Sequence, residues 1–389
     1  MSQLKVNTIR HTGASSDAVT LATDGTCTAK ITNNLSNRNL IINGAMQIAQ
    51  RGTSSTSTGF KTADRWEMYA GGANTTLTQS ISDVAAGTTP YQLGFRKAFK
   101  LLNAGQSGPD SNDSVRIQQK IEDQNIATSG WNYKSASSYL TLSFWVKSSV
   151  AQTFVINLMN RSDLGTSDIR NYSTTFSVGS ADTWTKITHS IPGSSTLTFD
   201  NDNTRGITVG IFLMRGTDNT TSGHSAGTWA TYNGSDLTPD MTSTWWTTSN
   251  ATFEMTGVQL EVGDVATDFE HRSYGDELAS CQRYCYADKG ANDYHAVAQG
   301  HYNGTTAGIC MLYTPVVMRA SPNLYYPEGT WICSGDAGTV NQTNIYPADN
   351  IGGVNAFQIR TAVSGAESGE GFLLRTSSVA HTWYLEAEL

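Results

Sequence analysis

The feature of this sequence that most constrains its fold is a series of short segments in which apolar and polar residues alternate, separated by connections rich in Gly, Asn and Ser. In residues 115–121, for example, every second side chain can face the same side of a strand. Alternation with a period of two is typical of a half-buried β-strand. The same pattern occurs at residues 140–146, 154–158, 209–213 and 253–260. The sequence therefore predicts an all-β fold, with a jelly-roll β-sandwich over residues 36–270.

Composition agrees with many short strands and narrows the range of partners. Charged residues make up only 15% of the chain and hydrophobic residues 38%, while 9 Trp, 16 Tyr and 12 Phe supply apolar surface for cores. The formal net charge of -8 disfavours binding to nucleic acid or to an anionic membrane through bulk charge. Since no apolar run approaches the ~20 residues of a membrane span, we expect no membrane insertion.

The N-terminal residues 1–35 are predicted to form a separate small element. They hold two short alternating segments but are too few to bury a core of their own, so this anchor needs a partner. The partner is either further copies of the chain or a larger body, and a frayed terminus is the alternative. The first residues lack the apolar core of a signal peptide, which predicts synthesis in a cytoplasm without export by the usual route. Residues 39–44 are predicted to be a strand that runs into a turn.

The pattern changes at residues 271–287, which are predicted to be a linker with one helix. Ser273 can cap a helix from Gly275 to about Tyr286, and apolar residues recur there at three- and four-residue spacing. Residues 288–389 return to short strands and are predicted to form a C-terminal β-rich tip domain, whose last strand closes a sheet at the chain end.

Two literal motif matches lack the context that their functions require. Residues 223–227 match the G-x-S-x-G pattern of hydrolases, but loop and strand residues flank them instead of the strand and helix that the nucleophile elbow needs. Residues 200–206 resemble the start of a calcium loop, but Ile211 occupies the position where the metal-binding glutamate belongs. A Gly/Ser turn and an Asx-rich turn are the predicted structures, with a structural calcium ion in the second as the alternative.

Aromatic side chains in loop-rich stretches are the candidate ligand-binding residues, because exposed rings stack on sugars and anchor interfaces. The candidates are Trp229, Tyr232, Trp245 and Trp246 in the jelly roll, and Tyr325, Tyr326, Trp331 and Tyr346 in the tip domain. Ordinary packing in a core or at a subunit contact is the alternative for both groups.

No catalytic or metal-binding pattern is apparent. The cysteines are odd in number and scattered, which favours reduced thiols, and the histidines show no paired spacing. The five cysteines are Cys27, Cys281, Cys285, Cys310 and Cys333. We therefore expect no catalytic residues, no metal site, no cofactor and no enzymatic activity.

Three segments of the predicted jelly roll carry a family resemblance. They are NLIINGAMQIAQRG at 39–52 with TADRW at 62–66, LSFWVK at 142–147, and TGVQLEVG at 256–263 continuing as ATDFEHRS at 266–273 and CQRY at 281–284. In this order they resemble phage tail-fibre and minor virion structural proteins of the marine and cyanobacterial phage type. The central domain of those proteins resembles a carbohydrate-binding module. The opening LKVNTI at 4–9 resembles N-termini that anchor such proteins to the particle.

The resemblance implies a structural component of a phage virion, made in the host cytoplasm and located in the tail. It implies a homotrimeric tail fibre whose N-terminus binds a tail adaptor or other virion protein. Since an anchor at one end places the other end outermost, we expect the tip domain to meet a host receptor, surface glycan or lipopolysaccharide. A capsid decoration or head-fibre protein without receptor binding is one alternative. A glycan-depolymerising tailspike is the other, and it would need paired carboxylates about 5–10 Å apart.

Overall fold

The computed structural model describes the chain outside several short gaps. The described residues are 6–15, 17–25, 27–29, 37–72, 76–105, 108–160, 168–289, 295–326, 331–335, 338–342, 345–363, 366–376 and 382–389. Side chains are described in these ranges except at residues 27–29, 289, 338–342, 345–352 and 382. Among the described helices, none has the length and apolar character to cross a membrane.

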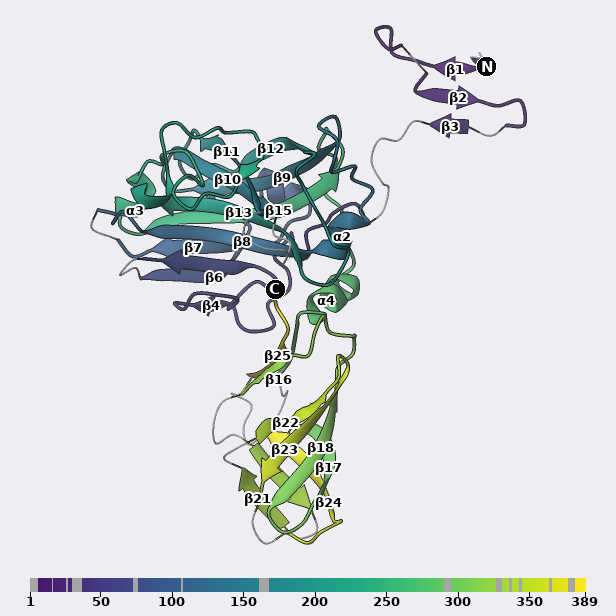
Figure 1. Cartoon of the computed structure of the whole chain (residues 1–389), viewed down its shortest axis with the longest axis vertical. Coiled ribbons are helices and arrows are strands. Elements are labelled where there is room, and N and C mark those ends of the chain that lie inside the picture. Colours follow the sequence, from purple (N-terminus) through teal and green to yellow (C-terminus); the bar gives the residue numbers. More distant parts are fainter. Residues whose placement is uncertain are drawn as a thin grey trace.

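Two six-stranded antiparallel sheets pack face to face and form a jelly-roll sandwich (Figure 1). The first, the β8 sheet, has the order β14-β11-β10-β13-β8-β5. Its strands are β5 (Glu67–Gly71), β8 (Ser114–Glu122), β10 (Gln152–Asn160), β11 (Arg170–Val178), β13 (Arg205–Arg215) and β14 (Ala230–Thr231). The second, the β9 sheet, has the order β12-β9-β15-β7-β6-β4. Its strands are β4 (Ser54–Ser55), β6 (Leu77–Asp83), β7 (Lys97–Asn103), β9 (Tyr139–Ser148), β12 (Thr185–Pro192) and β15 (Ala251–Val262).

The alternating segments direct their apolar side chains between the two sheets, as the sequence predicts. Leu142 and Phe144 of β9 are fully buried in the same core cluster as Ile211 of β13. The rings of Phe154 and Phe253, from opposite sheets, meet edge to face with centroids 5.1 Å apart. Since each such side chain contributes about 1.5–3 kcal/mol when it is fully buried, this core is the main source of stability in the sandwich.

The prediction of a strand at residues 39–44 is wrong. This segment is a loop, in which side-chain amides take the place of strand partners. Asn39 Oδ1 accepts hydrogen bonds from the backbone N–H groups of Ile41 and Leu260, both at 3.0 Å. Asn43 has a positive φ of 58° and donates from Nδ2 to the Ile48 carbonyl at 2.8 Å. Asparagine tolerates this left-handed conformation, and its amide satisfies backbone groups that a ladder would otherwise pair.

The helices of the described residues are short. They are α1 (Thr89–Gln92), α2 (Asp123–Ala127), α3 (Thr244–Thr247), α4 (Tyr274–Gln282) and the 3₁₀ helix η2 (Thr217–Asn219). The predicted cap of α4 is confirmed, since Ser273 Oγ accepts a hydrogen bond from Asp276 N at 3.2 Å. The helix ends earlier than predicted, at Gln282. Cys285 already belongs to the following strand, where it pairs with Glu386 near the end of the chain.

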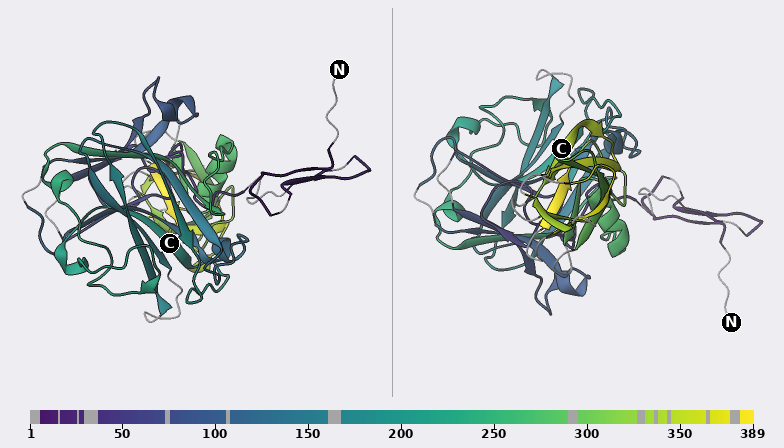
Figure 2. Two further views of the ribbon diagram at one scale, coloured as in Figure 1. Left: turned by 90° about the horizontal axis from the view of Figure 1, so that it is seen from above. Right: turned by 90° about the horizontal axis from the view of Figure 1, so that it is seen from below.

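The N-terminal element is a three-stranded antiparallel sheet that Figures 1 and 2 show apart from the jelly roll. Its strands are β1 (Thr8–Ile9), β2 (Val19–Leu21) and β3 (Cys27–Ala29), one more than the sequence predicts. Apolar side chains lie in the open: Val6 is 38% exposed, Ile9 56% and Leu21 39%. This sheet therefore has no core of its own among the described side chains.

The C-terminal domain consists of a three-stranded and a seven-stranded antiparallel sheet. The smaller sheet contains β16 (Cys285–Lys289), β25 (Thr382–Glu386) and β19 (Asn323–Tyr325), with β25 in the centre. The larger sheet contains, in spatial order, β21 (Gly338–Gln342), β20 (Trp331–Gly335), β24 (Gly371–Thr376), β17 (Ala296–Tyr302), β18 (Ala307–Tyr313), β23 (Ala356–Ala362) and β22 (Ile345–Gly352). The last strand of the chain thus lies inside the smaller sheet, between β16 and β19, and ties the chain end to the linker.

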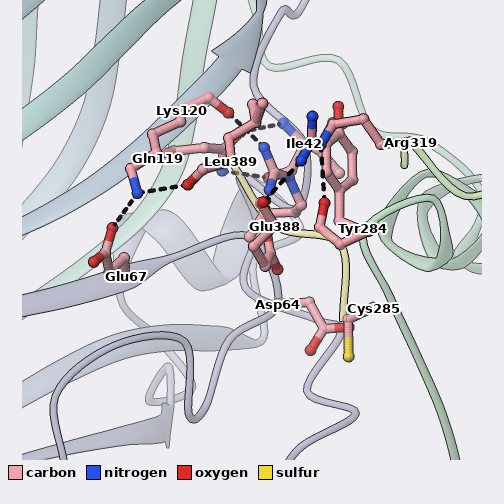
Figure 3. Close-up of polar contacts among 12 residues, drawn as sticks. Ile42, Asp64, Glu67, Gln119, Lys120, Tyr284, Cys285, Arg319, Glu388 and Leu389 are labelled. Carbon is pink, nitrogen blue, oxygen red and sulfur yellow. Dashed lines mark hydrogen bonds and ion pairs between the residues drawn. The ribbon is translucent and has the colours of Figure 1, made fainter. Parts of the chain in front are cut away.

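A buried polar junction joins the end of the chain to the jelly roll (Figure 3). Glu388 accepts hydrogen bonds from Arg51 Nη2 at 3.0 Å and from Arg65 Nη1. The side chains of Arg51 and Arg65 are 2% and 1% exposed, and that of Glu388 is 4% exposed. Lys120 Nζ donates to the backbone oxygen of Leu389 at 2.6 Å. Because a buried ion needs a partner, these contacts fix the chain end on the sandwich.

Residues next to α4 extend the junction on its other side. Glu122 is fully buried and accepts hydrogen bonds from Arg283 Nε at 2.7 Å and from Tyr284 Oη at 2.5 Å. Burial acts to raise the pKa of Glu122, but these hydrogen bonds outweigh it and hold the pKa below its ordinary value. Arg319 donates from Nη2 to the Glu388 carbonyl at 3.0 Å. The tip domain is therefore held on the jelly roll by charged groups from both.

Candidate functional site

The outer face of the β8 sheet is the candidate site, and strand alternation creates it. In β8 the apolar residues Val115 and Ile117 face the core, so Arg116 and Gln118 face outward. The antiparallel register places Tyr69 of β5 beside Arg116, and Phe212 of β13 on its other side. One row across the outer face is therefore aromatic, cationic and aromatic.

A β-bulge in β13 adds a second arginine to this face. Phe212 pairs with Arg116, whereas Met214 already pairs with Val115, so β13 has one extra residue at this point. Leu213 and Met214 both join the core cluster as a result. The alternation is shifted by one, and Arg215 emerges on the same outer face as Phe212.

The two guanidinium groups lie against the aromatic rings of this face. Arg116 Cζ is 4.2 Å from the centroid of the Tyr69 ring and 5.3 Å from that of Phe212. Arg215 Cζ is 4.7 Å from the Phe212 centroid. Phe212 is buried beneath them, while Tyr69 is 39% exposed. Tyr69 therefore offers an open ring face or edge, held in place by a cation–π contact.

The neighbouring row of side chains is polar and largely buried, since Gln118, Asn157 and Asn171 are 3%, 6% and 2% exposed. Gln118 Nε2 donates to Glu67 Oε2 at 2.7 Å, and Asn157 Nδ2 donates to Asn171 Oδ1 at 2.7 Å. Gly210 lies between the strands that carry Gln118 and Asn157. A Cβ atom on Gly210 would lie in ordinary van der Waals contact, 3.8 Å from the Asn157 carbonyl oxygen. Glu67, at the edge of this row, is only partly buried, so its carboxylate is the member best placed to accept hydrogen bonds from sugar hydroxyls.

The connection between β13 and β15 borders this face and brings Tyr232 to it. Strand β14 in this connection pairs with β11, and Asn171 Nδ2 donates to the Leu237 carbonyl at 2.9 Å. Tyr232 is 39% exposed, and its phenol acts on the pKa of both Arg116 and Arg215. Two half-exposed tyrosines, Tyr69 and Tyr232, therefore accompany the arginine pair.

The same connection is held by a hydrogen-bonded Ser–His–Asp chain that the sequence did not reveal. His224 Nε2 lies 2.5 Å from Ser173 Oγ, and His224 Nδ1 lies 2.6 Å from Asp236 Oδ1. Ser173 is fully buried, whereas the Asp236 side chain is 38% exposed. A nucleophile must reach its substrate, and the buried Ser173 could not. The chain of hydrogen bonds therefore anchors the connection to the sheet and is not a hydrolytic triad.

The jelly-roll aromatics predicted from the sequence separate into three environments. Tyr232 lies at the candidate face. Trp229 is half-buried, donates from Nε1 to the Pro192 carbonyl at 2.8 Å and packs on Tyr172. Trp245 and Trp246 are 0% and 2% exposed and belong to the sandwich core. The packing alternative therefore describes Trp245 and Trp246, which have no surface to offer a ligand.

The described aromatic candidates of the tip domain contact other aromatic rings. Trp331 is 2% exposed and lies near Trp383 in the domain core, so it is a packing residue. Tyr326 meets the Trp331 ring edge to face, with centroids 6.3 Å apart. Tyr325 is 42% exposed and stacks on Tyr384 at 4.9 Å. The side chain of Tyr346 lies outside the described residues.

The segments that carry the family resemblance pack together as framework. Trp66 Nε1 donates to the Asn43 carbonyl at 3.0 Å, and Asn39 Nδ2 donates to the Val258 carbonyl at 3.1 Å. Further along, the buried Glu261 accepts hydrogen bonds from Thr267 N at 2.8 Å and from Thr267 Oγ1 at 2.6 Å. These residues hold the ends of the sandwich together, which is a structural role.

Among the residues that the structure describes, no group of His, Cys, Asp and Glu side chains has metal-binding geometry. The calcium-like segment is an Asx turn, in which Asp202 Oδ1 accepts hydrogen bonds from Thr204 N at 2.8 Å and from Thr204 Oγ1 at 2.7 Å. Burial raises the pKa of Cys310 to about 12 and of Cys333 to about 11, which keeps both thiols protonated at neutral pH.

An aromatic-lined cavity on the other sheet is the main competitor for ligand binding. It has a volume of about 220 Å³ and is lined by Trp145 and Lys186 of the β9 sheet together with Phe95, Asp268 and His271. The outer face of the β8 sheet differs in that its tyrosines are exposed and its arginines have no carboxylate partner within 4.0 Å among the described residues.

No protein-family model matches this chain. No curated protein sequence matches it either.

Several solved structures share a region of the fold at low identity. The enzymatically active domain of tailspike protein 4 from bacteriophage CBA120 has a TM-score of 0.31 and 13% identity. The match covers 58% of this chain and 21% of the tailspike chain. The family 11 carbohydrate-binding module of a cellulosomal cellulase from Clostridium thermocellum has a TM-score of 0.27 and 13% identity, with 57% and 98% covered. A CBM4 structure gives a TM-score of 0.29 and 14% identity, with 57% and 98% covered. At such values, the functional case depends on the residues of the face itself.

Proposed function

We propose that this chain is a non-catalytic glycan-binding subunit of a phage tail fibre, and that the outer face of the β8 sheet binds the glycan. The observation that carries the proposal is the pair of half-exposed tyrosines, Tyr69 and Tyr232, beside a row of polar side chains on a rigid sheet. Aromatic rings cover the apolar faces of sugars, and amides with carboxylates bind their hydroxyls. The family resemblance of residues 36–286 supports the virion part of the proposal.

The N-terminal sheet supports a role in assembly. Its described apolar side chains, Val6, Ile9 and Leu21, are exposed, and burial of such side chains against other copies or a tail adaptor would stabilise it. We therefore retain the homotrimer, with the anchor directed to the particle, as part of the proposal. Mass photometry of the full chain tests it, and a monomer at micromolar concentration would contradict it.

The tip domain, expected from the sequence to meet the host, offers less for glycan recognition. Of its described candidates, Trp331 is buried and Tyr326 is half-buried, so Tyr325 alone is exposed, at 42%. Removing the domain is a poor test, because a chain ending at Tyr286 would lack Glu388 and leave Arg51 and Arg65 buried without it. Substitutions in the full chain separate the two locations without this loss.

The test is binding of the full chain to polysaccharide from host cells. Tyr69→Ala and Tyr232→Ala should each weaken binding by about threefold to tenfold, the value of an aromatic contact. Tyr313→Ala in the tip domain, where the side chain is 68% exposed, is the matched control, and Trp145→Ala tests the competing cavity. Loss of binding in either of these alone would place the site elsewhere.

Two alternatives remain distinguishable from this proposal. A depolymerase would release reducing sugars from the same polysaccharide, and none is expected. The carboxylate of the candidate face, Glu67, already pairs with Lys120 Nζ at 2.9 Å. A capsid decoration protein would bind no host polysaccharide, and imaging of virions with this chain labelled would place it on the head.

A further inference from the structure

The two arginines of the candidate face differ from Arg51 and Arg283 in their partners. Arg51 pairs with Glu386 at 3.0 Å, and Arg283 pairs with Glu122 at 2.7 Å. Neither Arg116 nor Arg215 has a carboxylate oxygen within 4.0 Å among the described residues. Arg116 Nε donates to the neutral amide of Gln118 at 2.7 Å. The face thus has two cations whose charges are not neutralised by ion pairs.

Arg215 is the more unusual of the two because it is buried. Its exposed fraction is 6%, its Nη1 makes only a 3.4 Å contact with Ser114 Oγ, and its Nε has no hydrogen-bond partner. A buried guanidinium with so few partners is costly, since each unsatisfied group loses its hydration. Such a group calls for an explanation, and a bound anion would supply one.

The nearby acids do not compensate for this charge. Asp110 and Asp240 border a cavity of about 420 Å³ beside Arg215, but neither forms an ion pair with it. Asp240 Oδ1 instead accepts a hydrogen bond from Thr220 Oγ1 at 2.7 Å. Glu67 is near Arg116 but pairs with Lys120 at 2.9 Å.

The arginines also repel each other. Burial, followed by the positive charge of Arg116, lowers the pKa of Arg215 to about 10. Both guanidiniums contact the ring of Phe212, at 5.3 Å from Arg116 Cζ and at 4.7 Å from Arg215 Cζ. An anion bound between them would neutralise this repulsion and supply acceptors to the free N–H groups.

We propose that Arg116 and Arg215 together bind the negatively charged group of an acidic sugar, a carboxylate or a sulfate ester. This inference rests on the proposed glycan-binding function and names its ligand class. The half-exposed rings of Tyr69 and Tyr232 are placed to contact the sugar ring while the arginines hold its charge. The guanidinium fork matches a planar carboxylate bidentately and also accepts sulfate oxygens.

A neutral sugar would leave the arginine pair unexplained, and a nucleic acid would meet a chain of net charge -8 with only this local patch to attract it. The anionic saccharide is therefore the ligand class that uses both features of the face: two cations without ion-pair partners and two half-exposed tyrosines.

The test is calorimetric titration of the full chain with four probes: galacturonate oligomers, dextran sulfate, neutral dextran and inorganic sulfate. We expect at least one acidic saccharide to bind, and its affinity to fall as salt is raised. Arg116→Gln and Arg215→Gln should each reduce that affinity about tenfold or more, the value of a charge-assisted hydrogen bond. The matched control is Arg96→Gln, because Arg96 also stacks on a tyrosine, at 3.9 Å from the Tyr91 ring, but lies away from this face.

Melting temperature with and without the acidic probe is the second readout. The probe should raise the melting temperature of the natural protein and not that of Arg116→Gln. Arg116 is the more exposed of the two arginines, so this variant still tests the inference if Arg215→Gln does not fold. Binding of dextran that depends on Tyr69 and Tyr232 but not on either arginine would overturn the inference and leave the glycan-binding proposal intact. Binding of inorganic sulfate alone, with no saccharide, would overturn the inference, as would no binding at all, while the glycan-binding proposal depends on the titration with host polysaccharide.

Discussion

Glu388→Ala tests whether the end of the chain is held on the jelly roll by charge. The side chain of Glu388 is 4% exposed, and it accepts hydrogen bonds from Arg51 and Arg65, which are 2% and 1% exposed. Removal of one partner from a buried ion pair costs about 3–5 kcal/mol, because the remaining charge stays buried. Arg51 keeps Glu386 at 3.0 Å, so the lower end of this range applies.

We therefore expect a loss of about 3 kcal/mol in the free energy of unfolding, or about 6–12 °C in melting temperature for a domain of this size. Urea unfolding followed by tryptophan fluorescence gives the value. The matched control is Asp83→Ala, since Asp83 pairs with Lys97 in solvent at 2.6 Å and should change stability by less than about 1 kcal/mol. A loss below about 1 kcal/mol for Glu388→Ala would refute the reasoning that the junction is dry and its charges are coupled.

Three further predictions concern groups inside the molecule. Burial raises the pKa of Asp64 from 3.8 to about 6 despite the nearby Arg51, so the native state binds the extra proton and stability falls as pH rises from about 4 to 6. The free energy of unfolding of the natural protein should fall by about 2–3 kcal/mol relative to that of Asp64→Asn over this range. A constant difference between the two proteins would argue against the raised pKa. In a Cys27→Ser background, an aromatic disulfide reagent should label the native protein only after urea is added, because burial raises the pKa of every remaining thiol; rapid labelling would contradict this. Ser173→Ala should lower stability by about 1–2 kcal/mol and weaken glycan binding through loss of the His224 contact, measured by urea unfolding and titration, whereas an effect on hydrolysis of an ester substrate would reopen the enzymatic alternative.

The strands of the sandwich could be predicted because their alternation is local. Residues 115–121 and 140–146 show which side chains enter the core, and the structure confirms both. Residues 39–44 look equally strand-like, yet Asn39 and Asn43 satisfy the backbone through side chains from a loop. Local pattern does not reveal a tertiary hydrogen bond to a strand more than two hundred residues away.

The candidate face was harder to predict because it depends on register. Alternation places Arg116 on the outer side of β8, but only the pairing with β5 and β13 shows that Tyr69 and Phe212 flank it. Arg215 follows the apolar residues 207, 209, 211 and 213 at the same spacing, so strict alternation would place it in the core. The bulge that brings it outward has no clear signature in the sequence.

The aromatic candidates show the same limit. Tyr232 does lie at the face, yet Trp245 and Trp246, close by in sequence, are in the core. Their short helix, α3, turns both indole rings inward, and no residue type in a loop-rich stretch distinguishes an exposed ring from a buried one.

A structure of the full chain bound to a glycan from the host surface is the most direct test of the central claim. The account predicts sugar density on the outer face of the β8 sheet, with a ring against Tyr69 or Tyr232. If the sugar carries a carboxylate or sulfate, that group should lie within hydrogen-bond distance of Arg116 and Arg215. Density only in the tip domain beside Tyr325, or only in the cavity beside Trp145, would contradict the assignment of the β8 face as the glycan-binding site.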